Sequence, residues 1–414
     1  MRLRGVSRAS IPPRVNVLVH KYGGTSVNGP DRIRAVAHRV AAARDAGHAM
    51  VVVVSAMGDT TDDLIALAHQ VSPRPSRREM DMLLTTGERV SMALLAMALH
   101  DLGVSAISFT GSQSGILTDE AHASARIVGV RPERIRAALE AGQVVIVAGF
   151  QGVSPVTKEI TTLGRGGSDT TAVALAAALG CARCEIFTDV DGVFTADPRI
   201  APAARLVSRM GYRVCSALAH LGGRVLHARS VDLAARERVP LAVRSSFRDA
   251  PGTDIMEEIV EAPRVEAVTH RAQVSLAIAE GNAGGRGEAR GILEAVAEQY
   301  PALELVAHEQ ADDTHGALVW MGSRDDVEAL QARFREVRGP GGEWRLDVVH
   351  DAGFVSLVGL GLGAAEAARA ERALERAGVS LVALRVTPAA LVFRVESARV
   401  EEAVRALHAA FLEG

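Results

Sequence analysis

The chain has 414 residues, of which 46 are lysine or arginine and 49 are aspartate or glutamate, and its formal net charge is −3. This balance excludes a dedicated nucleic-acid-binding protein and a polybasic membrane anchor, because both need an excess of basic residues. The hydrophobic share of 48% excludes a disordered chain, and the length predicts two or three domains of roughly 100–250 residues each.

The N-terminal segment carries arginines but no continuous apolar stretch, and no apolar run approaches the roughly 20 residues of a membrane span. We therefore expect neither a secretory signal nor a membrane span, and a cytoplasmic protein. Three cysteines are too few for a disulfide scaffold. Cys181 and Cys184 have the spacing of a redox or zinc motif, but a buried structural role is the favoured interpretation, because Cys184 opens an apolar run.

From Val15 to about Pro263, short apolar runs alternate with helical segments, which is typical of a mainly parallel sheet between two layers of helices. The predicted strands are 15–19, 50–54, 106–109, 144–148 and 185–188, and the predicted helices are 31–46, 79–102, 132–141 and 168–179. Most of these strands end in glycine, serine, threonine or aspartate. Open α/β sheets bind ligands at that edge, so we expect the functional site there.

After Pro263 the elements shorten into two approximate copies of a small α+β unit, one over 274–337 and one over 355–411, with a turn or linker at Gly339–Gly342. Two such copies indicate a binding appendage rather than a second catalytic centre. The sequence thus predicts a flexible tail (1–14), a three-layer α/β/α catalytic domain (15–262) and a region of two βαββαβ modules (263–414).

Three loops have the residue types of a phosphotransfer site. After the first strand, Lys21, Gly23 and Gly24 form a phosphate cradle, since glycines let backbone amides approach an anion and a lysine reaches phosphate oxygens. Only Lys21 and Lys158 are lysines, which makes the retained ammonium at Lys21 notable. The second loop, 161–171, surrounds Arg165 with glycines and runs into a helix for which Ser168 is a plausible N-cap.

The third loop, 188–199, is acidic and suited to hydrogen bonding a nucleotide or holding Mg²⁺ through water, although aspartates there also simply make turns. Two further segments, 55–61 and 85–89, follow or lie within predicted elements. Glu88, in the second of them, is as consistent with a solvated helix face as with binding a substrate ammonium.

Six motifs together look like those of aspartokinases, in the same order and spacing: Lys21-Tyr-Gly-Gly-Thr-Ser, Ser55-Ala-Met-Gly-Asp-Thr-Thr, Thr86-Gly-Glu-Arg, Val147-Ala-Gly-Phe-Gln-Gly, Thr162-Leu-Gly-Arg-Gly-Gly-Ser-Asp and Thr188-Asp-Val-Asp-Gly-Val. The resemblance covers nearly all of residues 15–260. The two C-terminal modules are similar in layout to tandem ACT domains. The resemblance implies transfer of the γ-phosphoryl group of ATP to the β-carboxylate of L-aspartate with Mg²⁺, and a homodimer formed through the ACT-like modules.

The resemblance also implies residue roles. Lys21, Gly23 and Gly24 would hold the phosphates, with Asp169 orienting Lys21, and Arg224 would supply a second cation. The nucleotide would contact Thr188, Asp189, Phe194 and Arg199. Arg165 would clamp a carboxylate of aspartate and Glu88 its ammonium, in a pocket closed by Ser55, Thr61, Phe150 and Ser168. No residue is implied as a direct metal ligand.

Several positions depart from the family pattern. Arg224 replaces a lysine, Phe194 a tyrosine, and the segment 210–216 lacks the usual Ser-Phe-x-Glu-Met. In the ACT-like region the effector-binding turn is replaced by Gly281–Gly287, the next Gln-Asn by Glu309–Gln310, and a Ser-Thr-Ser-Glu-Ile stretch by Leu384–Pro388. These replacements would leave polar groups of a bound effector without hydrogen-bond partners, so we expect weakened feedback inhibition by lysine and threonine.

Two other functions remain open at this point. A related kinase could act on another amino-acid carboxylate such as glutamate, because Arg165 and Glu88 would recognise any α-amino acid. A catalytically weak amino-acid sensor is the second alternative, suggested by Arg224 and the altered 210–216 segment.

Overall fold

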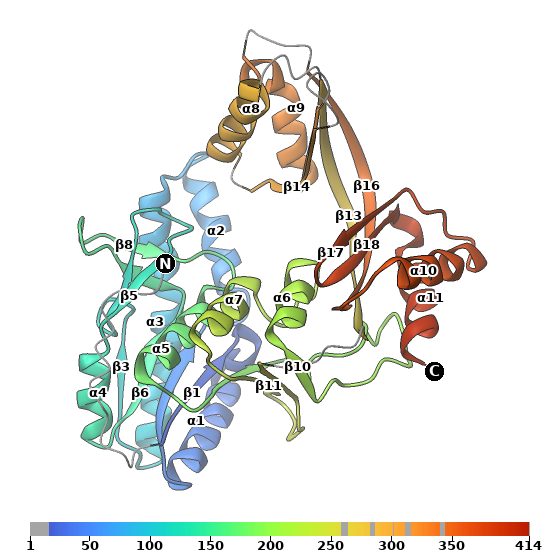
Figure 1. Cartoon of the computed structure of the whole chain (residues 1–414). Coiled ribbons are helices and arrows are strands. Elements are labelled where there is room, and N and C mark those ends of the chain that lie inside the picture. The colour runs from blue at the N-terminus through green and yellow to red at the C-terminus, as the bar shows by residue number, and fades with distance from the viewer. Residues whose placement is uncertain are drawn as a thin grey trace. The chain divides into compact units, whose positions relative to one another are not determined.

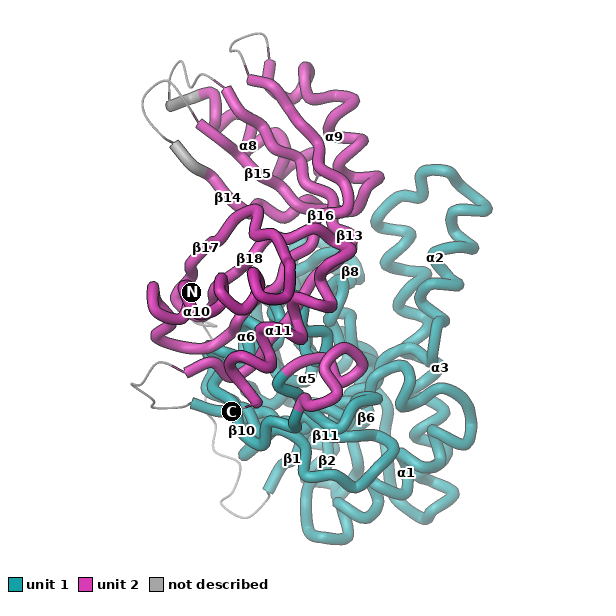
Figure 2. The backbone as a smooth tube through the Cα atoms, turned by 90° about the vertical axis from the view of Figure 1, so that its right-hand side faces the viewer, with its two compact units in different colours: residues 1–195, 205–261 teal, residues 196–204, 262–414 magenta. Residues whose placement is uncertain are grey.

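The computed structural model describes residues 16–257, 264–281, 286–300, 302–310, 316–339 and 344–413. The chain divides into two compact units, residues 1–195 with 205–261 (unit 1) and residues 196–204 with 262–414 (unit 2) (Figures 1 and 2). The predicted tail, and most of the predicted turn at Gly339–Gly342, lie outside the described residues.

Unit 1 is built on an eight-stranded sheet in the order β10-β12-β11-β9-β1-β2-β6-β3. The neighbours β11, β9, β1, β2, β6 and β3 run parallel, and β12 is antiparallel to β11, which confirms the predicted mainly parallel sheet. The strands are β1 Asn16–Tyr22, β2 His48–Val54, β3 Ala106–Phe109, β6 Val144–Ala148, β9 Cys184–Thr188, β10 Arg209–Gly211, β11 Leu241–Ser245 and β12 Thr253–Met256.

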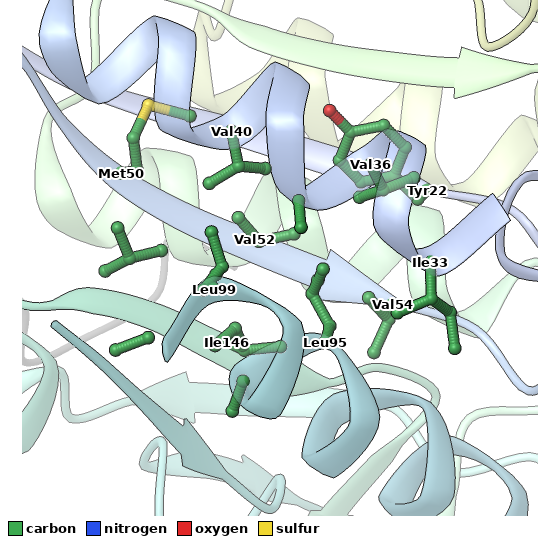
Figure 3. Close-up of a cluster of buried hydrophobic side chains, with 14 of the residues drawn as sticks. Tyr22, Ile33, Val36, Val40, Met50, Val52, Val54, Leu95, Leu99 and Ile146 are labelled. Atoms are coloured by element: carbon green, nitrogen blue, oxygen red, sulfur yellow. The ribbon is translucent and has the colours of Figure 1, made fainter. Parts of the chain in front are cut away.

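The helices of unit 1 are α1 Pro30–Asp45, α2 Thr60–Val71, α3 Arg77–Asp101, α4 Glu133–Glu140, α5 Gly167–Leu179, α6 Tyr212–His220 and α7 Ala228–Glu237, with a short 3₁₀ turn η1 at Gly24–Val27. Helices α1 and α3 pack their apolar sides against one face of β2 and β6 (Figure 3). The intervening side chains of β2, such as Val51 and Val53, are also fully buried, and α5 packs against β1, β2 and β9. Both faces of the sheet are therefore covered, as the runs without in/out alternation predicted.

A second, four-stranded sheet lies in unit 1 in the order β5-β4-β7-β8 and was not predicted. Its strands are β4 Ile116–Thr118, β5 Ile127–Val130, β7 Gln151–Val153 and β8 Ile160–Thr162. Each of these strands has three or four residues and includes glycine, glutamine or threonine, so none stands out as an apolar run. The sheet matters for function because β8 leads directly into the loop that carries Arg165.

Helix α3 is 25 residues long and apolar enough, by length and composition alone, to cross a membrane. The prediction from sequence identified no such segment. In the structure one side of α3 belongs to the core of unit 1, where Leu95 and Leu99 are fully buried against β2 and β6. The core helix of a globular protein passes the same length and composition test, and α3 contributes to the core of unit 1.

Unit 2 contains one six-stranded antiparallel sheet in the order β14-β15-β13-β16-β18-β17. Two α+β modules share it, because β13 and β16 each run through both halves and pair with each other along most of their length. The elements are β13 Arg264–Gly281, α8 Arg286–Gln299, β14 Glu304–Gln310, β15 Gly316–Gly322, α9 Arg324–Val337, β16 Arg345–Leu360, α10 Ala364–Arg376, β17 Ala383–Thr387, β18 Ala390–Glu396, η2 Ser397–Arg399 and α11 Val400–Leu412. Ala196 and Ala201, from the segment 196–204, pack in the core of this unit.

Candidate active site

The loops that follow the central parallel strands of unit 1 are fastened to one another at the carboxyl edge of the sheet. In each case a loop amide donates to a carbonyl of the neighbouring strand: Gly23 to Phe187 (3.3 Å), Ser55 to Tyr22 (3.1 Å), Gly149 to Val54 (3.0 Å) and Ser246 to Thr188 (2.8 Å). The predicted motifs at 21–24, 55–61, 147–152 and 188–191 therefore begin side by side, although they are far apart in sequence.

An ion pair joins the end of β1, which extends past the predicted strand 15–19 and includes Lys21, to helix α5. Lys21 Nζ lies 2.7 Å from Asp169 Oδ1, and the two side chains are only 12% and 11% exposed. Asp169 lies in the first turn of α5, where the helix dipole favours negative charge. The pair fixes the direction of an ammonium group next to a helix N-terminus, an arrangement suited to binding phosphate.

Gly24 brings the 55–58 loop against this cradle. A Cβ at Gly24 would lie 2.8 Å from the carbonyl oxygen of Ala56, so a larger residue would push the two loops apart. The amide of Gly58 donates to Gly24 O at 3.1 Å and holds the same contact. Gly24 is therefore required for close approach of the loops.

Glu88 projects from α3 towards the same loop and is 4% exposed, which excludes the interpretation of a solvated helix face. Its Oε1 accepts the amide of Ala56 at 3.1 Å, while Oε2 is buried and has no hydrogen-bond partner within the described part of the chain. Burial raises the pKa of Glu88 to about 7, although the Ala56 amide acts in the opposite direction. A buried carboxylate with one unsatisfied oxygen is suited to accept a cationic ligand group.

Helix α5 starts one residue earlier than predicted, and its N-cap lies two residues earlier. Its N-cap is Gly166, with φ of 69°, and not Ser168, which lies buried inside the first turn. The reason is steric as well as conformational, because a Cβ at Gly166 would lie 2.0 Å from Cγ of His227. Only glycine permits both the left-handed turn and this packing.

His227, at the N-cap of α7, packs against this turn and was not among the predicted site residues. It is half-buried, and burial lowers its pKa while the nearby carboxylate of Asp169 acts in the opposite direction. A histidine after a glycine-rich turn is a signal that sequence reasoning could have used.

Phe150 follows β6 and has φ of 67°, a conformation unusual for a bulky residue. Its amide donates to Thr171 Oγ1 at 3.2 Å, and its carbonyl accepts the amide of Leu163 at 2.8 Å. These bonds hold the loop after β6 against α5 and the loop after β8. Backbone strain of this kind concentrates at functional sites.

The other predicted site residues are placed less tightly. Arg165 is exposed at the tip of the Gly164–Gly167 loop, Thr61 is half-buried in the first turn of α2, and Thr188 Oγ1 donates to Asp189 Oδ1 at 3.0 Å. Arg224 is exposed on the turn between α6 and α7. Phe194 pairs with Leu206 in an isolated bridge, and Arg199, which belongs to unit 2, forms a salt bridge with Asp197 at 2.6 Å.

Among the described residues, no group of three or more histidine, cysteine or acidic side chains is arranged to hold a metal ion. Cys181 and Cys184 also lack the chemistry of a redox motif. Burial raises the pKa of Cys181 to about 12 and that of Cys184 well above its usual value, which disfavours the reactive thiolate.

Residues 16–245 match the model of the amino acid kinase family. The chain is 44% identical over 409 residues to an aspartokinase of Mycolicibacterium smegmatis, covering 95% of this chain and 96% of the relative, and 44% identical over 406 residues to one of Thermus thermophilus, covering 95% and 98%. Among solved structures, aspartate kinase from Synechocystis is 36% identical with a TM-score of 0.54, over 95% of this chain and 69% of that one. Aspartokinase III of E. coli, in complex with aspartate and ADP, shares the fold at 23% identity with a TM-score of 0.80, over 96% and 100%.

The raised pKa of Glu88 predicts a pH-dependent loss of stability. Between pH 4.5, the ordinary pKa of the group, and about 7, folded Glu88 keeps a proton that the unfolded chain releases, so the free energy of unfolding falls as pH rises through this window. Relative to Glu88→Gln, the wild type should lose up to about 3 kcal/mol of its free energy of unfolding across this window, measured by urea unfolding. Amide exchange of β2 should report the same loss locally.

The matched control is Glu79→Gln, which changes an exposed carboxylate of the same helix. The difference between this variant and the wild type should stay constant across the window. Equal slopes for both variants would contradict the assignment of the raised pKa to Glu88.

Proposed function

The chain belongs to the aspartokinases of the amino acid kinase family, and from this membership we propose how its own residues carry out the reaction. Aspartokinase activity is transfer of the γ-phosphoryl group of ATP to the β-carboxylate of L-aspartate, which yields 4-phospho-L-aspartate. Such a transfer depends on alignment and charge neutralisation more than on covalent help from the protein.

The 2.7 Å pair of Lys21 and Asp169 is the observation that carries the proposal for the phosphate end of the site. Lys21 binds the phosphates of ATP together with backbone amides at Gly23 and Gly24, and it neutralises charge on the transferred group. Asp169 keeps the ammonium from turning away before the nucleotide arrives. The N-terminus of α5 adds its positive dipole end to the same region.

For the acceptor, Arg165 binds a carboxylate of aspartate as a bidentate partner, and Glu88 binds the ammonium through its unsatisfied Oε2. The support is the burial of Glu88, because a desolvated carboxylate without a second partner gains most from a cation. Ser55, Thr61, Phe150 and Ser168 close the pocket around the acceptor. Arg165 and Glu88 alone do not set the length of the acceptor side chain, so a glutamate kinase is the alternative to be tested.

Thr188, Asp189, Phe194 and Arg199 bind the nucleotide in this proposal, and Arg224 serves as the second phosphate cation. These five roles rest on the motif match. Mg²⁺ would neutralise phosphate charge when bound, and the acidic loop 188–199 would hold it through water.

We also propose that residues 15–262 are the catalytic domain and that residues 263–414 are a regulatory region through which the chain forms a homodimer. We propose a cytoplasmic location, without nucleic-acid or membrane partners. Apolar side chains exposed at β17 and in the turn before it, Val386 (59%) and Val382 (55%), support association through unit 2.

The acceptor and the role of Lys21 are tested together by measuring ADP release from ATP and Mg²⁺ with aspartate, with glutamate and with no acceptor. We expect turnover with aspartate only, and a loss of at least about a hundredfold in Lys21→Ala, because a positioned charge on the transferred group is removed. Lys158→Ala changes an exposed lysine and is the matched control. Turnover without aspartate, or an unchanged Lys21→Ala, would refute the mechanism.

The exchange of lysine for Arg224 is tested by Arg224→Lys and Arg224→Ala. If Arg224 neutralises phosphate charge, Arg224→Lys keeps kcat within about threefold and Arg224→Ala lowers kcat/KM for ATP by about tenfold or more, as loss of a charge-assisted contact predicts. A catalytically weak sensor would instead gain activity when the family lysine is restored.

We propose weakened feedback because Leu384–Pro388, the stretch that replaces an effector-binding segment, already makes a hydrogen bond within unit 2. The side chain of Arg385, in β17, donates to the carbonyl of Val306 in β14. Most of Gly281–Gly287, and the side chains of Glu309 and Gln310, lie outside the described residues. ADP release should therefore fall less than about twofold with lysine and threonine at millimolar concentration. Strong inhibition there would reject this proposal.

A further inference from the structure

Asp81 is the most thoroughly buried carboxylate of α3, with no exposed surface, and it lies outside the proposed pocket residues. Thr162 Oγ1 donates to Asp81 Oδ1 at 2.5 Å, and His122 Nδ1 lies 2.6 Å from Oδ2. The amide of Ala123 donates to Oδ1 at 3.1 Å. A buried charge is tolerated when several donors satisfy it in this way.

These donors come from two loops that Asp81 ties together. Thr162 is the last residue of β8, immediately before the Leu163–Gly167 segment, and His122 and Ala123 belong to the loop between β4 and β5. Ala123 has φ of 67°, a conformation that needs support from its surroundings. The carboxylate supplies that support by accepting the Ala123 amide.

A second charged side chain, which is half-buried, holds the same backbone. Arg229, in α7, donates to the carbonyl of Leu163 at 2.5 Å and to that of Ala125 at 3.0 Å. A Cβ at Gly164 would lie 3.0 Å from the carbonyl oxygen of Ala123, so the loop after β8 packs directly on the loop that Asp81 anchors. The backbone that enters the Arg165 loop is thus fixed at consecutive residues, Thr162 and Leu163.

We propose that Asp81 is a positioning residue for the acceptor: acting through Thr162, it sets where the Gly164–Gly167 loop presents Arg165. The proposal rests on the role of Arg165 proposed above. A flexible glycine-rich loop reaches a defined geometry only if its base is rigid, and a displacement of about 1 Å from the productive geometry costs up to a hundredfold in rate. The ATP side of the site, at Lys21 and Asp169, is held by a separate ion pair and is left unchanged.

The test compares Thr162→Val, which removes the hydroxyl donor at nearly constant volume, with Thr162→Ser, which keeps it. We expect Thr162→Val to raise KM for aspartate about tenfold with KM for ATP within about twofold, and Thr162→Ser to stay near the wild type. Amide exchange over residues 163–168 should accelerate in Thr162→Val only.

Thr161→Val is the matched control, because it removes a buried hydroxyl one residue earlier that pairs with Thr118 at 2.6 Å and not with Asp81. It should leave the ratio of the two KM values unchanged. If Thr162→Val does not fold, His122→Ala, at a partly exposed partner of Asp81, should raise KM for aspartate about threefold with KM for ATP unchanged.

Three results would overturn the inference: equal changes in both KM values, a Thr161→Val effect as large as that of Thr162→Val, or unaltered kinetics in both Thr162→Val and His122→Ala. Arg165→Ala separates this inference from the proposed function. If Arg165→Ala leaves KM for aspartate unchanged, the role of Arg165 fails. If it raises that KM while neither Thr162→Val nor His122→Ala does, only the positioning role of Asp81 fails.

Discussion

The ion pair of Lys21 and Asp169 is the contact on which the arrangement of the site depends. It connects two segments separated by more than a third of the chain, at the edge where parallel strands end. A mainly parallel sheet makes this possible, because every parallel strand delivers its following loop to the same edge. The loops then need only short backbone hydrogen bonds to one another, and glycine at the closest approach, to form a continuous surface.

Helix α3 shows how one element supplies two carboxylates with different tasks. Asp81 and Glu88 are seven residues apart, about two helical turns, and so lie on the same buried side. Asp81 has donors for both oxygens and behaves as a structural anion. Glu88 has a donor for one oxygen only, and burial raises its pKa to about 7. The protein supplies donors for both oxygens of Asp81 and leaves one oxygen of Glu88 without a partner among the described residues.

Sequence patterns predicted the structure correctly where a buried run or several motifs constrained it. They failed where the structure depends on a single turn. Short apolar runs predicted five strands of the large sheet correctly to within a few residues. The missed β8 is three residues long, and the start of α5 was misplaced because a left-handed glycine, not a side-chain cap, begins the helix. In unit 2, the first α+β copy was predicted to begin at residue 274, but β13 already begins at Arg264. A register shift and two exposed residues at 272–273 interrupt its apolar pattern. The sequence could have predicted that Asp81 is buried, because helical periodicity places it on the same side of α3 as the buried Leu84, Glu88 and Leu95.

The scarcity of lysine acquires a physical explanation at two positions. The ammonium of Lys21 is enclosed: a Cβ on Gly23 would lie 3.5 Å from Nζ, and little of the side chain is exposed. A planar guanidinium is wider than an ammonium, so replacement by arginine would force the cradle open. Arg224 is exposed on a turn, where a longer side chain does not displace its neighbours. A change from lysine to arginine is therefore compatible with the exposed turn at residue 224. It is resisted at Lys21, where the shape of the cation is constrained in addition to its charge.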